Sequence, residues 1–332
     1  MNSLGKIFKI NIYGESHGKS LGVLIEGMPV GVKIDDALIK KDLKRRMPSH
    51  FSETKRKEKD HYTVESGVYN GYTTGTPLLF RVENNAFKSE HYQKYQEIHR
   101  PSHIDFVAKK KYHGYQNLPG SGHFSGRLTI GLVIAGALAK MILTKVIIKT
   151  ELVQVGALKD LTKLEQYLKT IETLNETVGA VLKTTISNVE IGLGEPFFGG
   201  ADSLISQALF SIPSIKGVSI GKGFKSASFL GSDYLDSFIN EEGKTKTNHS
   251  GGIVGGITNG NDLIINTITR PISSLKKPLE TFDFTKKKMT SLTIEGDHDF
   301  FIGERIKVVI ENTILAVLLD LSLQNKLLKE LT

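Results

Sequence analysis

The residues of this chain that could do chemistry gather in short glycine-rich motifs. The first, at 14–18, reads GESHG and places Ser16 and His17 between two glycines. An imidazole with small neighbours is sterically open, and its pKa near neutrality suits proton transfer. The motif also fits the G-x-S-x-G nucleophile elbow, which needs a helix after the serine. Residues 19–23 read as loop and strand, so a serine hydrolase using Ser16 is the weaker alternative, and a hairpin turn without chemistry is the simplest one.

Two further glycine-rich segments could approach a ligand closely. Residues 120–126, GSGHFSG, open an apolar helix, where free N–H groups and the helix dipole attract anions. They miss the dinucleotide fingerprint by one spacing and do not follow a strand, which argues against a Rossmann site. Residues 251–260, GGIVGGITNG, permit close backbone approach, either to a ligand or in a buried sheet crossing.

Metal ions and nucleic acids find little support in the sequence. Residues 297–299, DHD, could orient an imidazole or bind a metal, but no matching His or carboxylate array accompanies them, so we predict no metal site. The lysine runs 109–111 and 286–288 are typical of solvated surface, and no nucleic-acid-binding motif accompanies them. The absence of cysteine excludes disulfides, thiolate nucleophiles and cysteine-ligated zinc.

Charge and hydropathy narrow the class of protein further. The 332 residues include 43 Lys and Arg against 35 Asp and Glu, a net charge of +8 that favours anionic partners. The longest apolar run, 132–139, is far shorter than the roughly 18 residues of a membrane span. The first residues lack the features of a signal peptide. We therefore predict no membrane association and a cytoplasmic location.

The elements that must position these motifs show two spacings of apolar residues. A spacing of two is typical of strands, and a spacing of three to four is typical of helices. Spacing predicts strands over 6–13, 21–26, 62–69, 77–82, 152–155, 178–189, 217–220 and 263–269, and helices over 37–47, 127–146, 161–174, 201–210 and 304–328. Residues 50–60 are crowded with charge and predict an exposed loop. Residues 84–125 are irregular but hold five of the ten histidines and many aromatics, which favours a functional region over disorder. The chain reads as a mixed α/β or α+β protein with a single domain over 1–332.

Seven segments, in order and over essentially the whole chain, resemble chorismate synthase. They are GESHG at 14–18, RRMP at 45–48, TTGTP at 73–77, RPSHID at 100–105, SGRLTIGLVIAGALAK at 125–140, GGIVGGITNG at 251–260 and GDHD at 296–299. The resemblance implies 1,4-anti elimination of phosphate from 5-enolpyruvylshikimate 3-phosphate to give chorismate, a step of aromatic amino acid biosynthesis that requires reduced FMN. It also implies an α+β fold, a β-α-β sandwich with antiparallel sheets around a helical core, in a homotetramer.

The same resemblance implies roles for individual residues. His17 would protonate the departing phosphate, His103 would serve the reduced flavin, and Asp299 would help to remove the proton delivered to flavin N5. The implied flavin contacts are His123, Phe124, Ser125, Pro213, Ser214, Gly255, Arg270, Pro271, Ile272, Ser273 and Ser274. The implied substrate contacts are Ser16, Arg45, Arg46, Arg56 and Arg127. Whether NADPH or a separate flavin reductase supplies the electrons is left open.

The sequence also departs from the family pattern. Asp297 stands where the family has an arginine beside the flavin, Ser102 replaces a glycine, and the loop after Pro48 is shortened. The alternative within the family is therefore a divergent paralogue that binds flavin with weak or no elimination activity.

Overall fold

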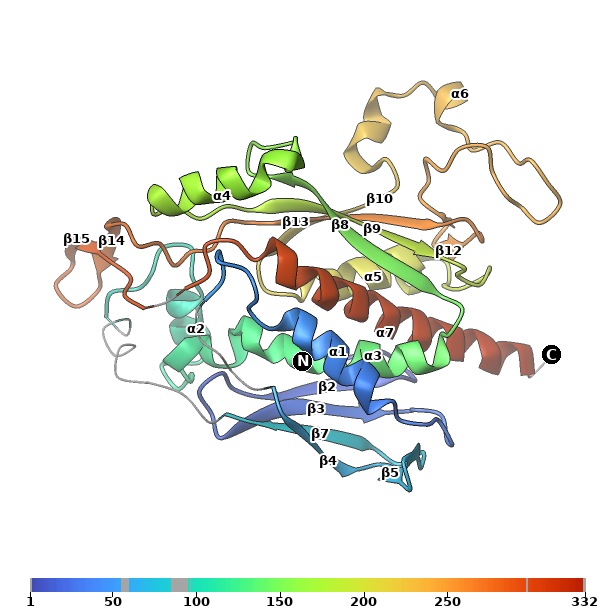
Figure 1. The fold of residues 1–332 in the computed structure, drawn as a ribbon, viewed down its shortest axis with the longest axis horizontal. Coiled ribbons are helices and arrows are strands. Elements are labelled where there is room, and N and C mark those ends of the chain that lie inside the picture. Colours follow the sequence, from blue (N-terminus) through green and yellow to red (C-terminus); the bar gives the residue numbers. More distant parts are fainter. Residues whose placement is uncertain (1, 55–59, 85–94, 96, 297, 331–332) are drawn as a thin grey trace.

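The computed structural model describes residues 2–54, 60–84, 95, 97–296 and 298–330. Two antiparallel sheets enclose a layer of helices, and one apolar core holds buried side chains from Phe8 to Leu321 (Figure 1). The predicted α+β class and the sandwich of antiparallel sheets around helices are confirmed. The single-domain organisation stays a prediction.

The first sheet has the strand order β1-β2-β3-β7-β4. Its strands are β1 Ser3–Leu4, β2 Lys9–Gly14, β3 Ser20–Glu26, β7 Leu78–Glu83 and β4 Tyr62–Ser66. Successive side chains of a strand point to opposite faces, so Val23 and Ile25 of β3 and Phe80 of β7 are buried on the helix side. A small ladder of β5 Val68–Tyr69 and β6 Tyr72–Thr73 lies beside it. The loop between β2 and β3 carries the 14–18 motif.

The second sheet has the order β10-β13-β9-β8. Its strands are β10 Ile215–Ile220, β13 Leu263–Thr269, β9 Ala180–Ser187 and β8 Ile147–Val155. Alternate residues of β9, among them Leu182 and Ile186, are buried. Two short ladders complete the strands, β11 Ile253–Val254 with β12 Ile257–Thr258 and β14 Leu279–Asp283 with β15 Lys288–Leu292.

Four helices lie between the sheets: α1 Asp36–Arg46, α3 Thr129–Ile142, α5 Ala201–Phe210 and α7 Gly303–Glu330 (Figure 1). The apolar sequence of α3 packs directly on α7, where a Cβ on Gly136 would lie 2.3 Å from the Cα atom of Asn312. Helix α4 Leu164–Thr173 covers the outer side of the second sheet. The shorter elements are α2 Asp105–Lys111, α6 Gly231–Tyr234 and the 3-10 turns η2 Pro119–Phe124, η3 Gly126–Leu128, η4 Leu161–Lys163, η5 Phe197–Gly199 and η6 Gly223–Ser228.

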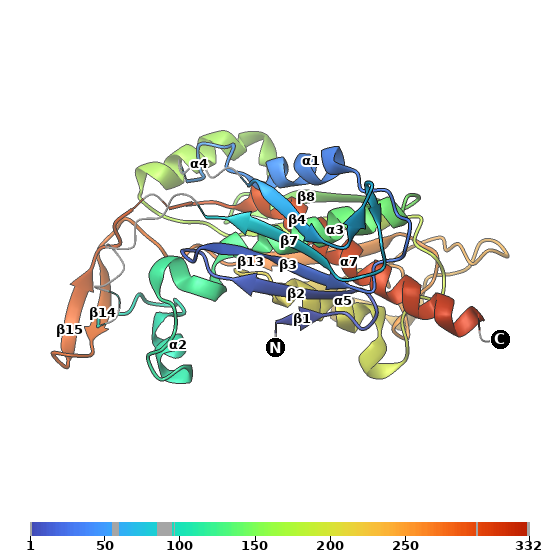
Figure 2. The same ribbon diagram turned by 90° about the horizontal axis from the view of Figure 1, so that it is seen from below.

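Several expected elements differ from the structure. The helix predicted over 127–146 is shorter, because η3 precedes α3. The irregular stretch 84–125 contains α2, and no element was expected where β14 and β15 pair. Strands β14 and β15 lie at one end of the molecule (Figures 1 and 2). There the ring of Phe284, just after β14, stacks on the ring of Phe106 from α2. Helix α2 and the two strands are short and largely exposed, so none of them has an apolar period that a sequence pattern could detect.

The charged segment 50–60 was expected to be an exposed loop, and this prediction is wrong for several of its described residues, although Phe51 is exposed. Ser52 and Glu53 are buried, and the Asp60 side chain is only 2% exposed. Charged groups bury when they are paired. The backbone N–H groups of Ser49 and His50 donate to Glu53, and Asp60 pairs with Arg46 and Arg127. Within the described ranges, no helix has the length and apolar content needed to cross a bilayer.

Asp320 of α7 attaches the N-terminal segment to the core. Its buried carboxylate accepts hydrogen bonds from the backbone N–H groups of Lys6, Ile7 and Phe8 at 2.7 to 3.1 Å. Asp320→Ala leaves these donors without an acceptor, and we expect the free energy of unfolding to fall by about 3 kcal/mol in urea titrations. Asp320→Asn keeps one acceptor oxygen and should lose less. A loss under about 1 kcal/mol for the alanine variant would contradict this account.

Candidate active site

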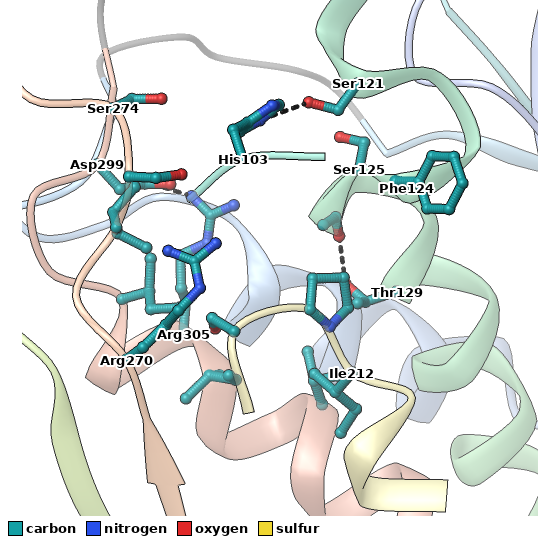
Figure 3. A pocket seen from close by; sticks show the side chains of 18 of the residues that line it. His103, Ser121, Phe124, Ser125, Thr129, Ile212, Arg270, Ser274, Asp299 and Arg305 are labelled. Atoms are coloured by element: carbon teal, nitrogen blue, oxygen red, sulfur yellow. Dashed lines mark hydrogen bonds and ion pairs between the residues drawn. The ribbon is translucent and has the colours of Figure 1, made fainter. Parts of the chain in front are cut away.

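A cavity of about 230 Å³ lies beside the first turns of α3 and α7 (Figure 3). Segments far apart in sequence meet there: the end of α1, the 103–129 region, the turn after α5 and the chain after β13. The lining residues are Arg46, His103, Ser121, Phe124, Ser125, Gly126, Thr129, Ile212, Pro213, Ser214, Arg270, Ile272, Ser273, Ser274, Asp299, Ile302, Arg305, Ile306 and Val309.

The charge of this cavity is predominantly positive. Arg46, Arg270 and Arg305 line it, and Asp299 is the one carboxylate among the described lining residues. Asp299 Oδ1 accepts a hydrogen bond from the Thr54 backbone N–H at 2.9 Å. It also accepts one from Arg305 Nη1 at 3.0 Å (Figure 3). Because arginine forks match carboxylate and phosphate geometry, the cavity is suited to anionic ligands.

Arg46 belongs to a buried ion network. The Asp60 carboxylate accepts hydrogen bonds from both Arg46 and Arg127. Burial alone would raise the pKa of Asp60, but attraction to the two guanidinium groups lowers it below its usual value. Burial also lowers the pKa of Arg46, against the attraction of Asp60. Arg46 Nε is buried and has no hydrogen-bond acceptor in the described part of the chain, so a donor remains for a ligand.

The predicted substrate arginines are only partly brought together. Arg46 lines the cavity, and Arg127 is connected to it through Asp60. Arg45 instead pairs with Glu311 at 2.7 Å and Asp42 at 3.5 Å, and it is not a lining residue. Arg56, like Asp297, lies outside the described residues.

His103 is held by a chain of polar contacts. Its Nδ1 atom lies 2.8 Å from Asp105 Oδ1, and Arg100 donates to both oxygens of Asp105 at 2.7 and 2.8 Å. Its Nε2 atom lies 3.2 Å from Ser121 Oγ at the cavity wall. Burial lowers the pKa of His103, although the hydrogen bond to Asp105 opposes this shift. Burial therefore favours the neutral form of the imidazole.

The turn at 119–122 separates His103 from His17. Gly120 has φ of +59°, and a Cβ built on it would lie 2.0 Å from His17 Nδ1. The 14–18 loop is fastened to this turn, since the Ser16 N–H donates to the Gly122 carbonyl at 3.0 Å. His17 and Ser16 are buried behind the turn and are not lining residues of the cavity.

Most of the predicted flavin segments meet at the cavity. Phe124, Ser125, Pro213, Ser214, Arg270, Ile272, Ser273 and Ser274 are lining residues. The Arg270 N–H donates to the Ser214 carbonyl at 2.9 Å, which joins two of the segments. Three predicted residues do not line it. His123 Nδ1 lies 2.8 Å from the Gly14 carbonyl, Pro271 accepts from Arg270 Nη1, and Gly255 lies in the turn between β11 and β12.

Sequence reasoning missed Arg305, Asp60 and Ser121. Arg305 lies in the first turn of α7, where the positive end of the helix dipole makes a cation unfavourable. An arginine at the start of a predicted helix was therefore an available sign of a functional residue. Asp60 gave no such sign, and Ser121 lay in the glycine-rich segment 120–126 without showing that its side chain would contact His103. Among the described residues, no group of three or more His, Asp or Glu side chains could hold a metal ion. The prediction of no metal site stays a prediction.

Comparison with known proteins agrees with the motifs. The family model for chorismate synthase matches residues 8–323. A chorismate synthase of Chitinophaga pinensis is 42% identical over 324 residues, 97% of each chain, and one of Thermococcus kodakarensis is 36% identical over 95% of this chain and 96% of that one. A crystal structure of chorismate synthase shares the fold, with a TM-score of 0.74 at 24% identity over 97% of this chain and 93% of that one. The chain therefore belongs to the chorismate synthase family and is a carbon–oxygen lyase.

Proposed function

We propose that this chain converts 5-enolpyruvylshikimate 3-phosphate to chorismate by 1,4-anti elimination of phosphate, with reduced FMN as its cofactor. The observation that carries the proposal is the charge of the cavity. Arg46, Arg270 and Arg305 line it, and Asp299 is the one carboxylate among its described lining residues. A substrate with two carboxylates and a phosphate, beside a flavin phosphate, needs this excess of positive charge.

The cavity also has buried polar atoms that a bound flavin could pair with. Ser214 Oγ and Arg46 Nε are buried without a hydrogen-bond partner in the described ranges, and both residues line the cavity. Buried polar atoms are nearly always paired, so a ligand with several acceptors would satisfy them. The segments 124–125, 213–214 and 270–274 would hold the flavin. Reduced FMN, when bound, supplies electron density that loosens the C–O bond to the phosphate.

The chain's own residues then bind, orient and move protons. The arginines bind the anionic groups in a partly enclosed cavity, where electrostatic attraction is stronger than in bulk water. From behind the turn at 119–122, His17 would deliver a proton to the departing phosphate, and His103, which lines the cavity, would exchange a proton with a bound reduced flavin. Asp299, oriented by Thr54 and Arg305, would help to remove the proton delivered to the flavin.

We further propose a cytoplasmic homotetramer. The arm around α6 projects from the body (Figure 1), and apolar side chains on it and near η5 are solvent-exposed, among them Phe197 at 85%, Phe198 at 95% and Phe224 at 90%. Contiguous exposed apolar patches mark protein interfaces, and an interface between copies of the chain would cover these side chains. Light scattering should give four times the 36.6 kDa mass of one chain. A monomer at micromolar concentration would contradict the tetramer.

The deciding experiment is phosphate release under anaerobic conditions. We expect release from 5-enolpyruvylshikimate 3-phosphate with chemically reduced FMN and none with oxidised FMN, because no described side chain can supply the electron density. Equal rates with both forms would refute the flavin dependence. Tight binding of reduced FMN without phosphate release would identify the divergent paralogue.

Two sources of electrons can be compared in the same assay. NADPH added with oxidised FMN restores activity if the enzyme reduces its own flavin. If it does not, a separate flavin reductase must be added to the mixture.

A further inference from the structure

Ser121, His103 and Asp105 form a serine–histidine–carboxylate array at the cavity wall. The Ser121 hydroxyl lies 3.2 Å from His103 Nε2, and His103 Nδ1 lies 2.8 Å from Asp105 Oδ1. Figure 3 shows the His103 and Ser121 side chains directed toward each other. This order of contacts is the one by which a histidine base activates a serine nucleophile in hydrolases of unrelated fold.

The protonation states follow from the partners. Burial alone would raise the pKa of the Asp105 carboxyl, but hydrogen bonds from Arg100 and His103 hold it well below its usual range. An ionised carboxylate only accepts, so His103 Nδ1 carries the hydrogen and Nε2 is the lone-pair acceptor. The Ser121 hydroxyl therefore donates to Nε2, as a nucleophile does toward its general base.

The backbone presents Ser121 on a strained turn. Ser121 has φ of +69°, between Gly120 at +59° and Gly122 at +51°. A non-glycine residue in this left-handed region stores strain, and such residues cluster at functional sites. The side chain is partly exposed and lines the cavity. Arg46, Arg270 and Arg305 line the same space and would stabilise an oxyanion formed there.

We propose that Ser121 is an activated nucleophile that reacts covalently with small activated acyl esters and fluorophosphonates. This reactivity is separate from the elimination, which forms no bond to the chain. With a fluorophosphonate, a bond forms between Ser121 Oγ and phosphorus, and the P–F bond breaks to release fluoride. The hydroxyl proton passes to His103 Nε2 and then to water. Asp105 stabilises the transient imidazolium through Nδ1–H.

The test is covalent labelling of the full chain without added flavin or substrate. The protein is incubated with a biotinylated ethyl fluorophosphonate, and the adduct is located by intact mass and peptide mapping. We expect one adduct per chain, at Ser121, and none in Ser121→Ala. Ser203→Ala, which removes an exposed serine of α5, should label like the wild type. His103→Gln should slow labelling by about 100-fold or more, because the general base is lost.

The location of the adduct in the unmodified sequence decides the proposal even if a variant folds poorly. No adduct, or an adduct at Ser125 or Ser214 instead, would overturn it. Unchanged labelling of a folded His103→Gln protein would also overturn it, because the serine would then not be activated by the histidine. Since neither FMN nor substrate is present, the result is independent of the elimination assay.

Discussion

Replacing His17 with alanine is expected to lower the rate of phosphate release by about 100- to 10,000-fold, the usual loss when a positioned proton donor is removed. The imidazole is buried at 9% exposure beside the glycine turn, so its position is defined. The loop that carries it is fastened by other groups. Asn84 Nδ2 donates to the carbonyls of Glu15 and Gly18, and the Ser16 N–H donates to Gly122. The variant should therefore stay folded.

The measurement is anaerobic phosphate release with reduced FMN, beside a thermal melt of each protein. His113→Asn is the matched control, since His113 is exposed, lies outside the cavity and has φ of +54°, a conformation that asparagine tolerates. The control should retain the wild-type rate. Wild-type turnover in a folded His17→Ala protein would remove His17 from the mechanism.

Local patterns predicted the elements that have a strong apolar period. A helix was predicted over 37–47, and Asp35 Oδ1 caps it by accepting a hydrogen bond from the Leu38 N–H at 3.0 Å at the start of α1. An apolar helix was predicted over 127–146, and α3 is apolar and buried along most of its length. These features depend on neighbours within a few residues, which is why sequence reasoning found them.

The cavity could not be predicted to the same extent, because its parts depend on long-range pairing. Arg45 and Arg46 are adjacent in sequence, yet one pairs with Glu311 and the other enters the network of Asp60. Helical geometry points neighbouring residues about 100° apart, so only one can face the cavity. The family motif places both together. The packing of α1 on α7 decides which of the two arginines lines the cavity, and a sequence pattern does not show that packing.

From the sequence, the turn at 119–122 was expected to do no more than contribute to an anion site. In the structure it lies between His17 and His103. Gly120 packs on His17, and Ser121 contacts His103. The spacing of a glycine loop shows that the backbone can turn sharply. It does not show which side chains will lie against that turn, and the contact with His17 joins residues about a hundred positions apart.

Substituting this glycine should therefore disable a histidine that remains in the sequence. In Gly120→Ala the new Cβ would lie 2.0 Å from His17 Nδ1 and 2.7 Å from Ser16 Oγ, so the imidazole must move. Misplacing a reacting group by about 1 Å can cost about 100-fold in rate, and we expect a loss of that size in phosphate release. Gly114→Ala is the matched control, because Gly114 also has positive φ, +85°, but nothing lies within 4 Å of its added Cβ.

Both glycine variants carry the strain of a non-glycine residue at positive φ, so both should lose about 1 to 2 kcal/mol of stability in urea titrations. Only Gly120→Ala should lose activity. If the loss comes from displacement of His17, it must nearly vanish in a His17→Ala background, because interacting sites are not additive. A Gly120→Ala effect of equal size in both backgrounds would show that the turn acts on catalysis through some other group. In that case the neighbouring contact between Ser121 and His103 would be the next to examine.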